Sequence, residues 1–217
     1  MDNYWIIGGG QFGLIAAETL SKTDSSNKLT IVEKQSAVCG QLEQLGFEVV
    51  CSDAIQYLER NLKSAHFPQW IVPAIPLHAA FEWIRAKMSA AFTLESIRIP
   101  NDIVSELPNP IQGATGQFFI STADFKCPPN CPEPDVICTF TGQPRPMVLH
   151  EYLKSLQIED FTSVVIQSHQ LAPGVGGYTP EALFDALDQI RNTQSPVLLS
   201  TACSCHGVMN AFHLLAR

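Results

Sequence analysis

A glycine-rich turn near the N-terminus is the feature that most constrains the fold of this 217-residue chain. Residues 4–7 have the composition of a buried strand, and the turn GGGQFG at residues 8–13 follows directly. Residues 14–20 have helical composition. Residues 29–32 form a second apolar strand that ends at Glu33, 20 residues after the last glycine of the turn. This order predicts a parallel βαβ unit with an acid at the end of its second strand.

The turn has the pattern G-x-G-x-x-G, in which each glycine has a separate physical role. Gly8 permits a tight turn, Gly10 lets the backbone approach a pyrophosphate, and Gly13 allows the helix to pack closely on the strand. Gln11 and Phe12 begin the helix, where free N–H groups and the positive end of the dipole favour a phosphate. The turn therefore predicts a dinucleotide site. The alternative is a glycine turn that only packs a helix.

Glu33 and Lys34 bear on which dinucleotide is bound. The Glu33 carboxylate can accept hydrogen bonds from ribose hydroxyls and repels a 2′-phosphate, which favours NAD over NADP. Lys34 would reach a 2′-phosphate if the loop turned, so NADP stays an alternative. FAD is the other alternative, because FAD-binding folds use the same glycine pattern and a similar glutamate.

The alternation of strands and helices continues beyond this unit. Residues 46–51 predict a third strand, and residues 53–63 an amphipathic helix that Asp53 caps. Residues 70–72 predict a fourth strand, followed by a helix whose first turn contains Pro76. Parallel strands with helical crossovers predict an α/β fold with a doubly wound, Rossmann-like sheet that binds ligands at the carboxyl ends of its strands.

The segments IIGGGQFGLIAAETL and LTIVEK, with the strand running into Ser52-Asp53-Ala54, resemble the NAD-binding domain of Trk-type potassium-uptake regulators and other small Rossmann dehydrogenases. The resemblance covers roughly residues 1–90. It implies a Rossmann fold with an adenine dinucleotide at the three glycines of the pattern and at Glu33. It does not imply potassium transport, because nothing after residue 100 resembles the ligand-binding part of those regulators.

Residues 100–115 are rich in proline and glycine and have no clear periodicity, so they form the expected junction of the chain. We therefore expect a dinucleotide-binding domain at residues 1–105 and a cysteine-rich α/β half at residues 106–217. The second half is either a separate domain or a continuation of the same sheet.

Three cysteines of the second half have the spacing C-x3-C-x6-C: Cys127, Cys131 and Cys138. Proline follows the first two and stiffens the loop, which lowers the entropy lost when thiolates converge on a metal. This pattern predicts a thiolate-bound metal centre or iron–sulfur cluster. The spacing is not the C-x2-C of structural zinc sites, although zinc stays open. Redox-active thiols and cysteines that only pack are the alternatives.

Cys203, Cys205 and His206 follow a predicted buried strand at residues 197–199. The segment after them, with apolar residues at 208, 209, 212 and 215, is expected to form a helix. Its N-terminus would lower the pKa of the thiols through the helix dipole. Any of these three residues is a candidate fourth ligand for the centre at Cys127, Cys131 and Cys138, with Cys203 or Cys205 favoured. The alternative is a separate reactive thiol with His206 as its base.

Two further histidines are candidates for proton transfer. His78 lies in the loop after the fourth strand, where a nicotinamide ring would lie, and can donate a proton at neutral pH. The alternative is a helix-start residue bonded to backbone groups. His169 lies at the end of a predicted strand at residues 162–166, beside a glycine-rich turn at residues 173–178. That turn either binds an anion or is only flexible.

Composition excludes several classes of protein. The net charge is −8 with no basic patch, so a nucleic acid partner is not expected. No run of about 18 apolar residues predicts a membrane span. The N-terminus lacks the features of a signal peptide, so we expect the cytoplasm. Charged residues make up only 16%, which favours a subunit interface and hence a symmetric homodimer.

These observations lead to two hypotheses of different classes. The first is an oxidoreductase that uses NAD(H) together with a cysteine-ligated metal or iron–sulfur centre in the same cleft. The second is a module without turnover, which senses or binds a nucleotide and contains a structural metal. No motif identifies a substrate or redox partner.

Overall fold

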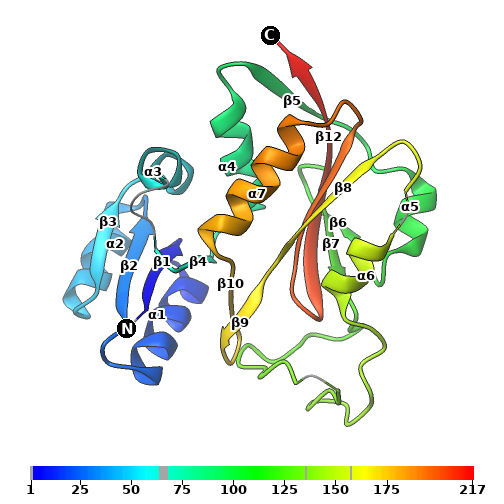
Figure 1. Cartoon of the computed structure of the whole chain (residues 1–217). Coiled ribbons are helices and arrows are strands. Elements are labelled where there is room, and N and C mark those ends of the chain that lie inside the picture. Colours follow the sequence, from blue (N-terminus) through cyan, green and yellow to red (C-terminus); the bar gives the residue numbers. More distant parts are fainter. Residues whose placement is uncertain (1, 64–67, 135, 157) are drawn as a thin grey trace.

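The computed structural model describes residues 2–63, 68–134, 136–156 and 158–217, which form two main sheets with helices between and around them (Figure 1). The first sheet is parallel and has the strand order β3-β2-β1-β4. Its strands are β1 (Asn3–Ile7), β2 (Lys28–Glu33), β3 (Glu48–Cys51) and β4 (Trp70–Pro73). The order and the parallel pairing confirm the Rossmann-like α/β fold.

Alternate side chains of β1 face two different cores, as the period of two in a strand requires. Tyr4 and Ile6 pack with residues of α1 (Gln11–Thr23) and α2 (Ser36–Gln44). Trp5 and Ile7 pack on the opposite face, in a core that includes Leu58 of α3 (Ala54–Asn61). Helices therefore cover both faces of the sheet.

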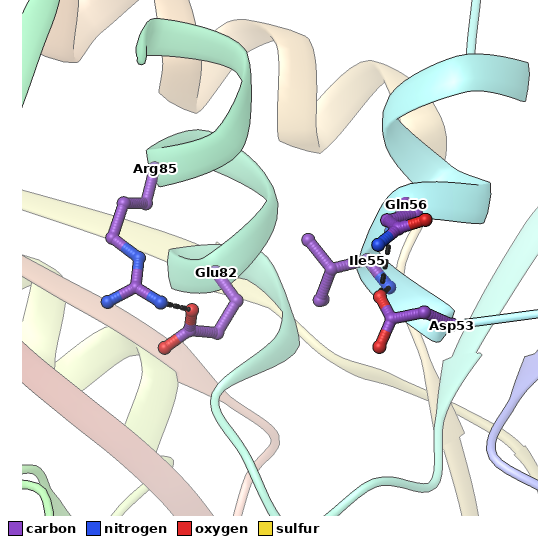
Figure 2. A network of polar contacts seen from close by, with 5 residues as sticks. All are labelled: Asp53, Ile55, Gln56, Glu82 and Arg85. Atoms are coloured by element: carbon purple, nitrogen blue, oxygen red, sulfur yellow. Dashed lines mark hydrogen bonds and ion pairs between the residues drawn. The ribbon is translucent and has the colours of Figure 1, made fainter. Parts of the chain in front are cut away.

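The starts of α3 and α4 (Ala79–Met88) test the predicted helix boundaries. Asp53 caps α3 as expected: its Oδ1 accepts hydrogen bonds from the N–H groups of Ile55 and Gln56, both at 3.0 Å (Figure 2). The placement of Pro76 in the first turn of α4 is wrong, because that helix begins three residues later with His78 as its N-cap. Glu82 and Arg85 form an ion pair along α4 (Figure 2).

The second sheet belongs mostly to the C-terminal half and is mixed rather than parallel. Strands β11 (Val197–Ala202) and β8 (Thr162–Gln167) pair in parallel. The remaining pairs are antiparallel, with the order β6-β7-β12-β11-β8. The other strands are β6 (Ile111–Gln112), β7 (Phe118–Ser121), β12 (His206–Ala216) and β5 (Phe92–Ser96), of which β5 also pairs with β12.

The helix expected after Cys205 is wrong: residues 206–216 form β12, the central strand of the second sheet. Its short apolar run fits a buried helix or a buried strand equally well by composition. Backbone pairing with β5, β7 and β11 stabilises residues 206–216 as a strand. The cysteines at 203 and 205 therefore lie in the turn of a β-hairpin.

The other elements of the second half lie around this sheet. They are α5 (Asn101–Glu106), α6 (Leu149–Ser155), β9 (His169–Ala172), β10 (Val175–Gly177) and α7 (Pro180–Arg191). The irregular segment expected at residues 100–115 instead contains α5. Most of the glycine-rich turn lies within the β9–β10 hairpin, and Thr179 caps α7 by accepting from the N–H of Ala182.

The two sheets share one hydrophobic core. Helices α4 and α7 lie between them (Figure 1), and this core contains Ile71 of β4 as well as Phe212 of β12. Ile71 and Tyr178 exchange two backbone hydrogen bonds of 2.9 and 3.0 Å, which join the edge of the first sheet to the β9–β10 hairpin. The division at residue 105 stays a prediction, although β5 already pairs in the second sheet. None of the helices in the described ranges is long and apolar enough to span a bilayer.

Candidate functional site

The three glycines of the pattern differ in the space around them. Gly8 has φ +111°, and a Cβ there would lie 2.7 Å from the carbonyl oxygen of Ala74. A Cβ on Gly13 would lie 1.9 Å from the carbonyl oxygen of Gly8, so α1 packs against the turn without space for a side chain. Around Gly10, no atom lies within 4 Å of the Cβ position. The open position is the one predicted to face a pyrophosphate.

The buried Glu33 carboxylate holds the glycine turn in place. Its Oε2 accepts from the N–H of Gly9 at 2.8 Å, and its Oε1 accepts from the N–H groups of Lys34 and Gln35, both at 2.8 Å. Each carboxylate oxygen can accept about two hydrogen bonds, so Oε2 retains one acceptor site. Glu33 therefore has a structural role that its position in the sequence did not indicate. The predicted role toward a ribose hydroxyl requires the remaining site on Oε2.

A cavity of about 670 Å³ lies beside this turn. Phe12 of α1 and the residues 72–74 at the carboxyl end of β4 form part of its wall. The loops of the second half and the β11–β12 turn form the rest. All five cysteines predicted as metal ligands line this cavity: Cys127, Cys131, Cys138, Cys203 and Cys205. The second half thus brings them together beside the start of α1.

Backbone N–H groups point at the sulfur atoms of several of these cysteines. Cys131 Sγ accepts from the N–H of Glu133 at 3.5 Å. Cys203 Sγ accepts from the N–H groups of Cys205 and His206 at 3.4 and 3.3 Å. The pKa of Cys138 lies below its ordinary value, because the N–H and hydroxyl of Thr141 and the N–H of Phe140 stabilise the thiolate.

The expected lowering of thiol pKa at the β11–β12 turn is wrong. Burial raises the pKa of Cys203 to about 12, and the Glu133 carboxylate raises it further. Burial also raises the pKa of Cys205. The physical reason is that a strand, and not a helix N-terminus, follows this turn, so no helix dipole favours the thiolate.

The thiols differ in their neighbours. The pKa of Cys127 is raised first by burial and then by the nearby thiols of Cys131, Cys205 and Cys138. Cys203 instead interacts with Glu133. Within the described ranges, no three His, Cys, Asp or Glu side chains are grouped closely enough to hold a single metal ion.

The three predicted histidines lie in different surroundings. His206 lines the cavity, and burial lowers its pKa. His169 does not line the cavity. Its ring lies edge-on to the Trp70 ring, with the two ring centroids 5.5 Å apart. His78 is buried away from the cavity: its Nδ1 lies 2.8 Å from Asn210 Oδ1, and its Nε2 lies 2.8 Å from Thr201 Oγ1. Both ring nitrogens of His78 are thus occupied by partners from β12 and β11, which indicates a structural role.

Glu133, Arg145 and Gln170 are among the polar residues of the cavity wall to which sequence reasoning gave no role. Glu133 has φ +47°, a strained value outside glycine, and its Oε1 accepts from the N–H of Ser204 at 2.5 Å. The Arg145 guanidinium donates to the carbonyl of Pro134. Isolated charges in a proline-rich loop give no sequence signal, because their importance comes from distant partners.

The stability of the protein is expected to fall as the pH drops below neutral, partly because of His78. Burial lowers the pKa of His78 to about 4 in the folded state, against 6.5 when exposed. The unfolded state therefore binds the extra proton first, and stability is lost as pH falls from about 6.5 to 4. Between pH 7.5 and 5.0 this loss of stability amounts to about 2 kcal/mol for this one group.

Urea unfolding at both pH values measures this loss. His78→Gln should be less stable at pH 7.5 but lose correspondingly less at pH 5.0, and an equal loss in both proteins would contradict the assignment.

Two family models match different parts of the chain. The TrkA-N domain model matches residues 4–67, and TrkA-N domains bind NAD(H) in general, which confirms the resemblance seen in the sequence. A protein of Archaeoglobus fulgidus described as uncharacterized is 28% identical over 221 residues, covering 95% of this chain and 97% of its own length. No solved structure matches the chain. The family model described as "Uncharacterized protein, C-terminal domain" matches residues 80–215, more than half of the chain, and the chain therefore belongs to that family.

Proposed function

We propose that this protein is an oxidoreductase that binds NAD(H) on the glycine turn and exchanges a hydride with a substrate in the cysteine-lined cavity. The observation that carries the proposal is the position of that cavity. It adjoins α1, which starts at the open Gly10, and is bounded by the carboxyl end of β4. In open α/β sheets this end of the strands is where ligands and reacting groups bind.

The dinucleotide has a defined place in this proposal. The pyrophosphate lies over Gly10 and receives the free N–H groups of Gln11 and Phe12 at the start of α1. One ribose hydroxyl donates to the acceptor site left on Glu33 Oε2. The nicotinamide then extends past β1 toward the cavity wall formed by β4. Lys34 is exposed at the end of β2, so NADPH is a necessary comparison.

We further propose that four of the cavity cysteines hold an iron–sulfur cluster: Cys127, Cys131, Cys138 and Cys205. The N–H groups directed at Cys131 and Cys138 are of the kind that stabilise thiolate ligands and tune clusters. A single zinc ion needs thiols about 4 Å apart, since Zn–S bonds are about 2.3 Å. The described side chains contain no such group of three, so the proposed cluster rests on the four thiols lining one cavity and not on a formed metal site.

A cluster of this kind exchanges single electrons, whereas a nicotinamide exchanges a hydride. Direct coupling of the two needs an intermediary such as a flavin, and FAD is therefore included among the ligands to be tested. The chain's own contribution is orientation. The turn holds the dinucleotide, Glu133 and Arg145 place charges at the cavity wall, and His206 is the histidine positioned to move a proton there.

The second candidate function is nucleotide sensing without turnover. The match to a TrkA-N domain favours it, because such domains also occur as regulatory modules. Both ring nitrogens of His78 are hydrogen-bonded within the core, which removes one candidate proton donor for catalysis. This loss also favours nucleotide sensing. Continuous turnover of NADH with an artificial electron acceptor separates the two candidates.

Purification without oxygen, followed by ligand and metal measurements, tests the proposal. NADH is expected to raise the melting temperature more than NADPH, because ligand binding to the native state stabilises it and Glu33 disfavours a 2′-phosphate. Bound iron and sulfide in comparable amounts are expected, with broad visible absorbance. Stoichiometric zinc without sulfide would support the sensing module, and protein free of both metals would remove the cluster from the proposal.

Gly10→Ala makes this test specific to the turn. The Cβ position at Gly10 is open, so the variant should keep the melting temperature of the parent within about 2 °C. The added methyl group occupies the predicted place of the pyrophosphate, and the affinity for NADH should fall at least about tenfold. Gly40→Ala, where no atom lies within 4 Å either, is the matched control and should bind NADH normally. Unchanged binding by Gly10→Ala would sink the proposed dinucleotide site.

A further inference from the structure

Two cysteines outside the cavity lie next to Glu33. Cys51 is the last residue of β3, is exposed, and is the register partner of Glu33 in the sheet. Cys39 lies in α2 and is only 4% exposed, and its thiol donates to the backbone carbonyl of Glu33 at 3.3 Å. Both cysteines therefore contact or flank the residue whose carboxylate fixes the glycine turn.

The two thiols are also direct neighbours. Burial raises the pKa of Cys39 to about 11, and the second cause is a hydrogen bond with the thiol of Cys51. One thiol is thus accessible to a reagent and the other is shielded but within contact of the first. This is the arrangement of an attacking thiol with a resolving partner in redox-sensitive proteins.

We propose that Cys39 and Cys51 are a redox-active thiol pair whose disulfide lowers the affinity of the protein for NAD(H). The formation of the disulfide is independent of the proposed function, whereas its effect on affinity rests on that function. Reversible disulfides inside reducing compartments are typically regulatory or catalytic.

The oxidant in this proposal is a low-molecular-weight disulfide. The Cys51 thiolate attacks one of its sulfur atoms, which forms a mixed disulfide and releases one small thiol. Cys39 loses its proton and attacks the Cys51 sulfur, which forms the Cys39–Cys51 bond and releases the second small thiol. Two protein thiols are oxidised and one small disulfide is reduced to two thiols. An excess of a dithiol reverses both steps.

The disulfide would act on the nucleotide site through the segment between β2 and α2. Oxidation removes the S–H donor that Cys39 offers to the Glu33 carbonyl. It also ties the first turn of α2 to the end of β3. The N–H groups of Lys34 and Gln35, which hold Glu33 Oε1, lie in the short connection that must adjust. A displaced Glu33 then loses its alignment with the ribose and with Gly9.

The test compares the parent protein with Cys51→Ser, which changes an exposed side chain and leaves the core intact. Both proteins are incubated in buffers of reduced or oxidised glutathione, mapped by peptide mass spectrometry without reduction, and titrated with NADH. In the parent we expect a Cys39–Cys51 peptide and an affinity about tenfold weaker, restored by dithiothreitol. Cys51→Ser should show the same affinity in both buffers, although its cavity cysteines are exposed to the same oxidant.

Two results would overturn the inference. The first is the absence of a Cys39–Cys51 peptide from the oxidised parent protein. The second is an equal loss of NADH affinity in the parent and in Cys51→Ser, which would place the effect in the cavity cysteines. If reduced protein failed to bind NADH, the proposed function would fail, and the peptide map would still decide whether the thiol pair exists.

Discussion

Gly13→Ala is expected to destabilise the native protein by more than about 4 kcal/mol, at the upper end of the range for single substitutions. The new Cβ would lie 1.9 Å from the carbonyl oxygen of Gly8, well inside any allowed contact. Relief requires α1 to move away from β1. However, Ala16, Ala17 and Leu20 of this helix are buried against the sheet, so the movement opens a core. Urea unfolding followed by circular dichroism, or loss of soluble protein on expression, measures the effect.

Gly40→Ala is the matched control for this prediction, because it also lies within a helix but has no atom within 4 Å of its Cβ position. Alanine is a better helix former than glycine by about 1 kcal/mol, so this variant should be as stable as the parent or more stable. A Gly13→Ala protein with the parent's stability would contradict the close packing of α1 on the turn.

The first sheet could be predicted from the sequence because its determinants are local. The glycine turn and the Asp53 cap each act within a few residues, and Glu33 lies at the end of β2 as expected, although its hydrogen bond to the Gly9 N–H spans 24 residues. Hydrophobic periodicity then sets the order of strands and helices. The close approach of Gly8 to Ala74 was not foreseeable, since it depends on how β4 joins the sheet.

The second sheet was harder to predict because its determinants are distant in sequence. β12 becomes a strand through pairing with β5 and β7, more than 80 residues earlier, and its own apolar run does not distinguish helix from strand. The same holds for His78, whose partners Thr201 and Asn210 lie over 120 residues away. The spacing of Cys127, Cys131 and Cys138 predicted a shared site for these three, whereas the presence of Cys203 and Cys205 in the same cavity wall was only one of two alternatives. The reason given for their reactivity failed, because it depended on the missing helix.

Gly174→Ala is expected to reduce bound iron and sulfide by more than about tenfold, if the cavity cysteines hold a cluster, while NADH binding stays within about threefold. Gly174 has φ +76°, and a Cβ there would lie 1.7 Å from the carbonyl oxygen of Pro129. Its N–H donates to the carbonyl of Cys131 at 2.8 Å, and Gln170 Nε2 donates to the same oxygen at 2.7 Å. These two hydrogen bonds from the β9–β10 hairpin fix the position of the loop that contains Cys127 and Cys131. A methyl group at this point forces the loop away and moves Cys131 from the other thiols.

Gly142→Ala is the control that separates the steric overlap of Gly174→Ala with the Pro129 carbonyl from the backbone strain of a positive φ. Gly142 has φ +68° and lies in the loop that contains Cys127, Cys131 and Cys138. No atom lies within 4 Å of its Cβ position. Alanine in the left-handed region costs about 1–2 kcal/mol at either glycine, so both variants bear similar strain and only Gly174→Ala meets the loop. Iron analysis of the two proteins, purified side by side without oxygen, should show loss only in Gly174→Ala. Equal loss in both would mean that strain in the loop, and not the steric overlap, governs the centre. Full iron content in Gly174→Ala would mean that its ligands do not depend on Cys131.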